Sequence, residues 1–280
     1  VISGYLITNI ILKDLAKGEF SFKEFWLRRA RRILPAVYSV MIFSLIAFTF
    51  LFSPDYYEKF GNSVFYQIFF ASNFLFASEA GYFDNVSTSK PLLHTWSLAI
   101  EEQFYVLLPL ILFFSHKFST KFRNALVFII VAASLTSSIY LSPIAQTDSF
   151  YLLHTRAWEL GIGSLLAIYL QSSKAKKPSN LLLEILSLIS LIAIIAPIFT
   201  YDKFTIFPYY TALLPCLGAA LFIYTNSFNQ TFSAKLFSAK PVVFIGLISY
   251  SLYLWHWVLI VLNEAMHITE PVSELSLIHI

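Results

Sequence analysis

The sequence predicts an all-α fold, a polytopic bundle of helices that crosses a membrane about eight times. Hydrophobic residues make up 58% of its 280 residues and charged residues only 12%, about half the charge of a soluble domain. Apolar windows long enough to cross a bilayer recur along the whole chain. This composition excludes a soluble enzyme, a disordered chain and a nucleic-acid-binding module, so no nucleic-acid partner is expected.

A hydrocarbon core of about 30 Å needs roughly 20 apolar residues of helix. The windows that qualify, in chain order, are 33–53, 95–115, 123–142, 153–171, 181–199, 206–225 and 242–262. An apolar stretch at 1–12 is expected to be the remaining part of an eighth span. The window 63–78 is short and carries Gln67 and Asn73, so it suits either a crossing or a segment that dips in and returns.

Basic loops give the orientation, because Lys and Arg in short loops mark the cytoplasmic side. Residues 13–32 are rich in Lys and Arg and are expected inside the cell, together with the loops at 117–123, 174–177 and 235–240. This holds only if 63–78 does not cross. The outer segments then hold just Lys59, Lys90 and Lys203 of the 19 basic residues. We therefore predict that 63–78 is re-entrant or interfacial, which makes 54–94 one outward excursion and suggests a cavity there.

The chain is predicted to be a single membrane domain over residues 1–280, since no repeat of fixed period and no flexible linker divides it. It begins and ends within apolar stretches, so we expect it to be a piece of a longer protein. Its one cysteine, Cys216, allows no disulfide within the chain.

Ionisable side chains within spans are costly and usually face a cavity or a partner. Three groups stand out: His94 with Glu101 and Glu102, Arg156 with Glu159, and Tyr253 with His256. The orientation places each group within about two to three helical turns of the outer boundary. Together they suggest one outward-facing site.

Structural roles account for the same residues. Glu101 and Glu102 point about 100° apart, and one of them could pair with Arg156. Arg156 and Glu159 are spaced to pair with each other on one helix face. His256 lies between two tryptophans, as is normal at a membrane interface. His94 lies at a helix mouth, where Thr95 or Ser97 could cap the helix.

The cytoplasmic segment contains a dense arginine cluster, formed by Arg28, Arg29, Arg31 and Arg32. Guanidinium groups bind phosphates in a forked geometry that lysine cannot match, which favours a site for a phosphorylated donor. The alternatives are topology signalling and binding of anionic lipid. Metal-binding spacings, the GxSxG motif and the P-loop motif are missing from the sequence, so no metal site, serine hydrolase or nucleotide triphosphatase is expected.

Five motifs in order closely resemble the acyltransferase-3 family, whose members are bacterial integral-membrane O-acyltransferases that modify cell-surface polysaccharides, including lipopolysaccharide O-antigen. The motifs are ISGYLIT at 2–8, FWLRRARRILP at 25–35, LLHTWSLAIEEQFY at 92–105, RAWELGIGSLLA at 156–167 and SYSLYLWHW at 249–257. Because they extend over nearly the whole chain, the resemblance is specific.

The resemblance implies transfer of an acyl group, usually acetyl, from cytoplasmic acyl-CoA to a hydroxyl of an outer polysaccharide or glycolipid. It implies a multi-pass protein of the bacterial inner membrane, in contact with lipid, with acyl-CoA as donor substrate and no permanently bound cofactor. Arg28, Arg29, Arg31 and Arg32 are expected beside the CoA phosphates. The residues expected in or around the transfer cavity are His94, Glu101 or Glu102, Arg156, Glu159 and His256.

The expected chemistry assigns a role to each residue type. A histidine takes the proton of the sugar hydroxyl, Glu101 or Glu102 orients that histidine, and Arg156 stabilises the charge on the thioester oxygen. Direct transfer and an acyl-enzyme both fit.

The chain departs from the family at both ends. The family's first helix carries an arginine and, eleven positions later, a histidine regarded as the principal catalytic residue, and that helix would precede Val1. We expect the family's last helix to be at most begun at the C-terminus, and this chain to be inactive by itself. Many relatives carry an outer SGNH-type domain beyond that helix. The rival interpretations are a transporter or flippase for a lipid-linked sugar or anionic solute, whose polar spans would look alike, and a structural membrane subunit.

Overall fold

The computed structural model describes residues 1–79, 90–172, 175, 177–202 and 204–266. Three positions used to predict orientation, Lys174, Lys176 and Lys203, lie outside the described residues. So do residues 80–89 of the predicted outward excursion and residues 267–280, where the expected final helix would start.

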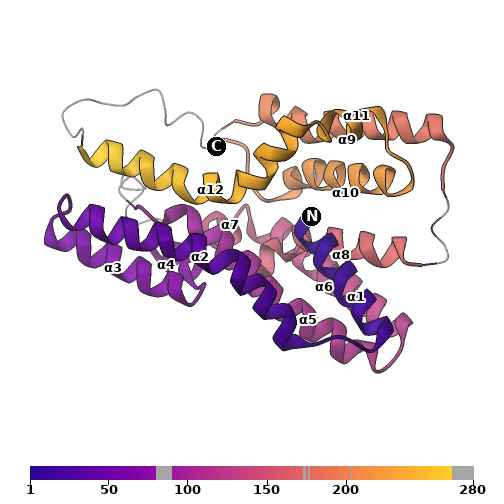
Figure 1. The fold of residues 1–280 in the computed structure, drawn as a ribbon, viewed down its shortest axis with the longest axis horizontal. Coiled ribbons are helices and arrows are strands. Elements are labelled where there is room, and N and C mark those ends of the chain that lie inside the picture. The colour runs from indigo at the N-terminus through magenta and orange to yellow at the C-terminus, as the bar shows by residue number, and fades with distance from the viewer. Residues whose placement is uncertain (80–89, 173–174, 176, 203, 267–280) are drawn as a thin grey trace. The chain divides into compact units, whose positions relative to one another are not determined.

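Every regular element within the described ranges is a helix (Figure 1). In chain order these are α1 (Ile2–Lys17), α2 (Phe22–Thr49), α3 (Pro54–Ile68), α4 (Ser72–Glu79), the 3-10 helix η2 (Leu93–Thr95), α5 (Trp96–His116), α6 (Thr120–Leu141), α7 (Gln146–Tyr151), α8 (Leu153–Leu170), α9 (Asn180–Thr200), the 3-10 helix η3 (Tyr210–Ala212), α10 (Leu213–Phe228), α11 (Phe232–Phe237) and α12 (Lys240–Met266). The predicted all-α class is confirmed.

The helices form two compact units. Unit 1 contains residues 1–20 and 103–243, and unit 2 contains residues 21–102 and those from 244 onward. Each unit is therefore built from two separate stretches of the chain. Helix α5 begins in unit 2 and ends in unit 1, and the first residues of α12 belong to unit 1.

Six helices of the described chain are long and apolar enough to cross a membrane. They are Phe22–Thr49, Leu93–His116, Thr120–Leu141, Asn180–Thr200, Tyr210–Phe228 and Lys240–Met266. These match six of the predicted windows, so a multi-pass membrane protein is confirmed. The other two windows form α8, which carries Arg156 and Glu159, and α1, which has only 16 residues.

The ambiguous window 63–78 does not form one long helix. It is divided between α3 and α4, with Phe70 between them at a φ of 51°, a backbone region that non-glycine residues rarely adopt. Helix α3 has 15 residues and α4 has eight, both shorter than the roughly 20 that a span needs. The interfacial or re-entrant placement stays a prediction.

Two polar residues of this window, Gln67 and Ser72, are buried in unit 2 and hydrogen-bonded. Ser72 Oγ donates to Gln67 Oε1 at 2.8 Å, and Thr95 Oγ1 lies 3.2 Å from Ser72 Oγ. All three side chains are at most 1% exposed. Buried polar groups of this kind need such partners. They join α3 and α4 to η2, the short helix that carries His94.

Glycines let helices of unit 1 approach closely. A methyl group on Gly4 of α1 would lie 1.9 Å from the Leu160 carbonyl oxygen of α8, and one on Gly163 of α8 would lie 1.9 Å from the Val1 oxygen. Small residues at helix crossings allow this backbone contact in membranes. The glycines of RAWELGIGSLLA therefore have a packing role.

Candidate active site

Two histidines far apart in sequence come together in unit 2. His94 lies in η2 and His256 in α12, and their ring centroids are 5.7 Å apart at an interplanar angle of 75°. The Tyr253 ring completes the group, 5.3 Å from the His94 ring and 5.6 Å from the His256 ring. The structure thus brings together residues from two of the three polar groups that the sequence singles out.

The Tyr253 hydroxyl links both segments. Its oxygen lies 2.7 Å from Ser97 Oγ of α5, and it donates a hydrogen bond to the backbone carbonyl of His94. Because Tyr253 is one turn before His256 on α12, a single hydroxyl connects the backbones that carry both histidines.

The tautomer of His256 follows from its own hydrogen bond. His256 Nδ1 lies 2.5 Å from the backbone carbonyl oxygen of Tyr253. A carbonyl oxygen only accepts hydrogen bonds, so Nδ1 carries the hydrogen and donates it. In the neutral ring the lone pair then resides on Nε2, which is the arrangement a general base requires.

Helix α12 is held by side-chain donors along one face. Tyr250 donates to the Ile33 carbonyl oxygen at 3.3 Å, and Trp257 Nε1 donates to that of Lys90 at 2.8 Å. With Tyr253 these residues are spaced i, i+3 and i+7, which places them on one helix face. The motif SYSLYLWHW therefore contains three hydrogen-bond donors that hold the helix in place, and one histidine that is a candidate for proton transfer.

Glu101 and Glu102 lie on α5, less than two turns after Ser97. Glu102 Oε1 is buried and has no hydrogen-bond partner among the described residues, while the positive charge of Arg29 on α2 acts on this carboxylate. From the charge pattern of the sequence, the arginines are expected near the cytoplasmic side and the glutamates near the outer side. The structure instead brings Arg29 within electrostatic range of Glu102.

The arginine cluster is divided by exposure. Arg28, Arg31 and Arg32 are exposed, whereas Arg29 is half-buried with its guanidinium carbon 5.0 Å from the centroid of the Phe25 ring. Arg28 Nη1 lies 3.7 Å from the exposed carboxylate of Glu24. Three guanidinium groups thus remain accessible to an anion, and Arg29 faces the interior of unit 2.

Arg156 and Glu159 form an ion pair in unit 1. Arg156 Nη2 lies 3.1 Å from Glu159 Oε2, and Nη1 donates to the Phe150 carbonyl oxygen at 3.3 Å. The guanidinium carbon lies 5.2 Å and 5.3 Å from the ring centroids of Phe150 and Phe207. The i, i+3 pairing that the sequence analysis left open is therefore formed, and cation–π contacts hold the arginine in place.

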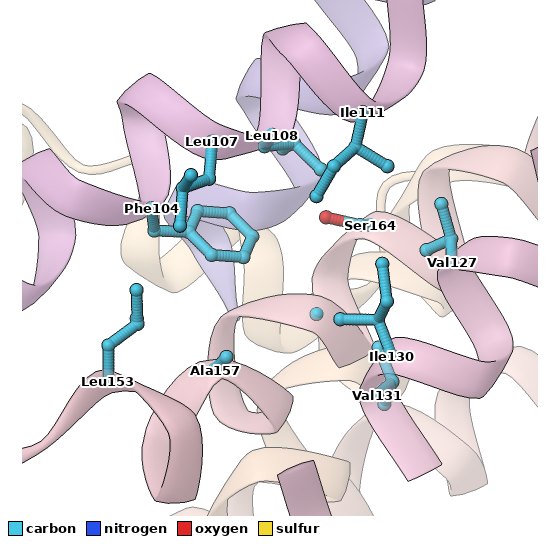
Figure 2. Close-up of a pocket in the computed structure, with 11 residues that line it drawn as sticks. Phe104, Leu107, Leu108, Ile111, Val127, Ile130, Val131, Leu153, Ala157 and Ser164 are labelled. Atoms are coloured by element: carbon cyan, nitrogen blue, oxygen red, sulfur yellow. The ribbon is translucent and has the colours of Figure 1, made fainter. Parts of the chain in front are cut away.

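An apolar cavity of about 70 Å³ lies in unit 1 among α5, α6 and α8 (Figure 2). Eleven residues line it: Phe104, Leu107, Leu108, Ile111, Val127, Ile130, Val131, Leu153, Ala157, Gly161 and Ser164. The sequence-predicted site residues are not among them. The described residues also contain no group of His, Cys, Asp and Glu side chains able to hold a metal ion.

Comparison with protein families identifies the family of this chain. A family model described as an acyltransferase domain matches residues 1–267. The chain belongs to the acyltransferase-3 family. The match extends over both units, and it favours the acyltransferase interpretation over the transporter and the structural subunit.

Three relatives illustrate the range of this acyltransferase family. An uncharacterized protein of Haemophilus influenzae is 37% identical over 82% of this chain and 97% of its own length. The peptidoglycan O-acetyltransferase OatA of Listeria monocytogenes is 34% identical over 97% of this chain and 45% of its own. The O-acetyltransferase OatA of Staphylococcus aureus is 31% identical over 96% of this chain and 46% of its own length. The chain therefore spans less than half the length of the OatA relatives. No solved structure matches it.

Two features of this acyltransferase domain escaped the sequence analysis. Ser97 was considered only as a helix cap, yet its hydroxyl meets Tyr253 across 156 positions of sequence. Arg29 was grouped with its neighbours, although its burial differs from theirs. The spacing of Tyr250, Tyr253 and Trp257 on one helix face was a signal that Tyr253 contacts another segment, here Ser97. The effect of the Arg29 charge on Glu102 had no signal in the local sequence.

Proposed function

We propose that this protein is a membrane O-acetyltransferase that moves an acetyl group from acetyl-CoA to a hydroxyl of a cell-surface polysaccharide. The observation that carries the proposal is the cluster of His94, His256 and Tyr253, on two segments long and apolar enough to cross a membrane, in an acyltransferase-3 chain. Two histidines in such a position suit proton transfer to and from a hydroxyl at neutral pH.

The proposed reaction transfers the acetyl group from the sulfur of CoA to the oxygen of the sugar. The sugar hydroxyl oxygen forms a bond to the acetyl carbonyl carbon, and the bond from that carbon to the CoA sulfur breaks. The hydroxyl proton passes to a histidine, and the departing thiolate takes up a proton to leave free CoA. Of the histidines in this chain we assign the accepting role to His256, because its Nδ1 hydrogen bond leaves the lone pair on Nε2. Transfer through an acyl-enzyme divides the same balance into two steps.

The donor site is assigned to the exposed arginines. Arg28, Arg31 and Arg32 present guanidinium groups to solvent near the start of α2, and such groups bind phosphate with two parallel hydrogen bonds. We place them on the cytoplasmic side of the bacterial inner membrane, where acetyl-CoA is available. Glu101 or Glu102 is assigned to orienting the histidine that accepts the proton. The role of Arg156 and Glu159 in transfer stays a prediction.

The acceptor is proposed to be a polysaccharide outside that membrane. Two relatives are named for peptidoglycan or for O-acetyl transfer, so peptidoglycan is the first acceptor to test. Lipopolysaccharide O-antigen, which the resemblance in sequence also suggests, is the second. Both offer sugar hydroxyls to the same chemistry.

The test uses the full-length gene in its host. Acetate released by mild base is measured from purified peptidoglycan and from purified lipopolysaccharide, in cells with and without the gene. One complementing variant carries Arg28→Ala, Arg31→Ala and Arg32→Ala. A matched control carries Lys13→Ala, Lys17→Ala and Lys23→Ala, which removes as much charge from the same predicted side.

We expect one of the two polymers to lose its acetate in cells that lack the gene. The lysine variant should restore at least about half of that acetate, and the arginine variant less than about a tenth. Equal restoration by both variants contradicts the donor assignment. Unchanged acetate in both polymers without the gene contradicts the proposed function and returns the transporter to consideration.

A further inference from the structure

Tyr253 has more contacts within the histidine cluster than fastening a helix requires. Its hydroxyl lies 2.7 Å from Ser97 Oγ and donates to the His94 carbonyl. Its ring packs edge-on against His94 at 5.3 Å and beside His256 at 5.6 Å. Its own carbonyl accepts the hydrogen bond from His256 Nδ1. The ring of Tyr253 therefore contacts both histidines, its hydroxyl contacts His94, and its backbone carbonyl contacts His256.

The segment that Tyr253 holds has little regular structure of its own. His94 lies in η2, a single 3-10 turn, whose hydrogen bonds are weaker than those of an α-helix. Two neighbouring contacts tie the same segment down, from Trp257 to the Lys90 carbonyl and from Thr95 to Ser72. The backbone carbonyl of His94 itself accepts hydrogen bonds from the Tyr253 hydroxyl and, at 3.4 Å, from Ser97 Oγ.

We propose that Tyr253 is a positioning residue for acyl transfer, whose hydroxyl, shared between Ser97 and the His94 carbonyl, sets the two histidine rings at their working separation. The inference rests on the proposed function. Small displacements of reacting groups lower rates strongly, about a hundredfold for 1 Å. A hydroxyl that joins η2, α5 and α12 at one point controls such a displacement directly.

The experiment compares Tyr253→Phe with Tyr250→Phe in the full-length protein. Both variants keep the aromatic ring and lose one hydroxyl on the same face of α12, and the Tyr250 hydroxyl binds the Ile33 carbonyl of α2. Acetyl transfer to a soluble oligosaccharide is measured in proteoliposomes supplied with acetyl-CoA, as kcat, KM and their dependence on pH. Ser97→Ala is included in case Tyr253→Phe does not fold.

For Tyr253→Phe we expect kcat to fall about 10- to 100-fold, with the KM for acetyl-CoA within about twofold, because the exposed arginines are untouched. The limb of the pH profile that reports the proton acceptor shifts by about half a unit or more. Ser97→Ala shows the same shift with a smaller loss of kcat. Tyr250→Phe keeps the pH profile of the unmodified protein.

Two results overturn the inference in distinguishable ways. If Tyr253→Phe and Tyr250→Phe lose rate equally and neither shifts the pH profile, Tyr253 only stabilises the helix, and the proposed function stands. If the unmodified protein transfers no acetyl group in the same vesicles, the proposed function fails and the positioning role fails with it.

Discussion

At the scale of single residues, the positive charge of Arg29 acts on the buried carboxyl group of Glu102 in unit 2. One Glu102 carboxylate oxygen is buried without a hydrogen-bond partner in the described chain, and Arg29 supplies the positive charge that acts on it. We expect Glu102→Gln and Arg29→Gln each to lower the thermal unfolding midpoint in detergent, because each leaves one charge uncompensated. The double variant recovers part of the loss, with a coupling of about 0.5–3 kcal/mol.

The pair between Arg28 and Glu24 is the matched control. Its atoms are 3.7 Å apart, and its side chains are 58% and 69% exposed. Exposed pairs contribute about 0–1 kcal/mol, so Arg28→Gln should leave the midpoint nearly unchanged. Additive losses for Glu102→Gln and Arg29→Gln would show that the two side chains act independently.

At the scale of elements, the crossing of α1 and α8 depends on two glycines. A Cβ on Gly4 or Gly163 would meet backbone oxygens at 1.9 Å, and backbone atoms cannot move aside as a flexible side chain does. We expect Gly163→Ala to destabilise the fold by at least about 2 kcal/mol. The measurement is the thermal unfolding midpoint in detergent, together with the fraction of protein that elutes as a single species.

Gly246 of α12 is the control for helix propensity, because a Cβ there meets no other atom within 4 Å. Alanine is favoured over glycine inside a helix by about 0.5–1 kcal/mol, so Gly246→Ala should leave stability equal or slightly higher. Equal midpoints for Gly163→Ala and Gly246→Ala are incompatible with the close crossing.

At the scale of the whole molecule, the sequence predicts well those properties that depend on composition along the chain. Six spans follow from apolar windows because the bilayer sets the length, and the family follows from five ordered motifs. Contacts between distant segments have no such signal. Tertiary packing brings His94 to His256 and brings the charge of Arg29 within range of Glu102. The break at Phe70 is likewise invisible, because the surrounding run has no glycine or proline to mark it.

Orientation is the remaining property of the whole chain that the charge pattern predicts. If the stretch that forms α3 and α4 returns to the side from which it entered, its two ends face the same compartment. Ser53 before α3 and Ser78 near the end of α4 are both exposed.

In a Cys216→Ser background, Ser53→Cys and Ser78→Cys should both react with a membrane-impermeant maleimide added outside intact spheroplasts. Lys117→Cys, in a basic loop predicted to be cytoplasmic, should react only after lysis. Labelling of Ser53→Cys and Ser78→Cys from opposite sides would mean that this stretch crosses the membrane, and every later loop would then change sides.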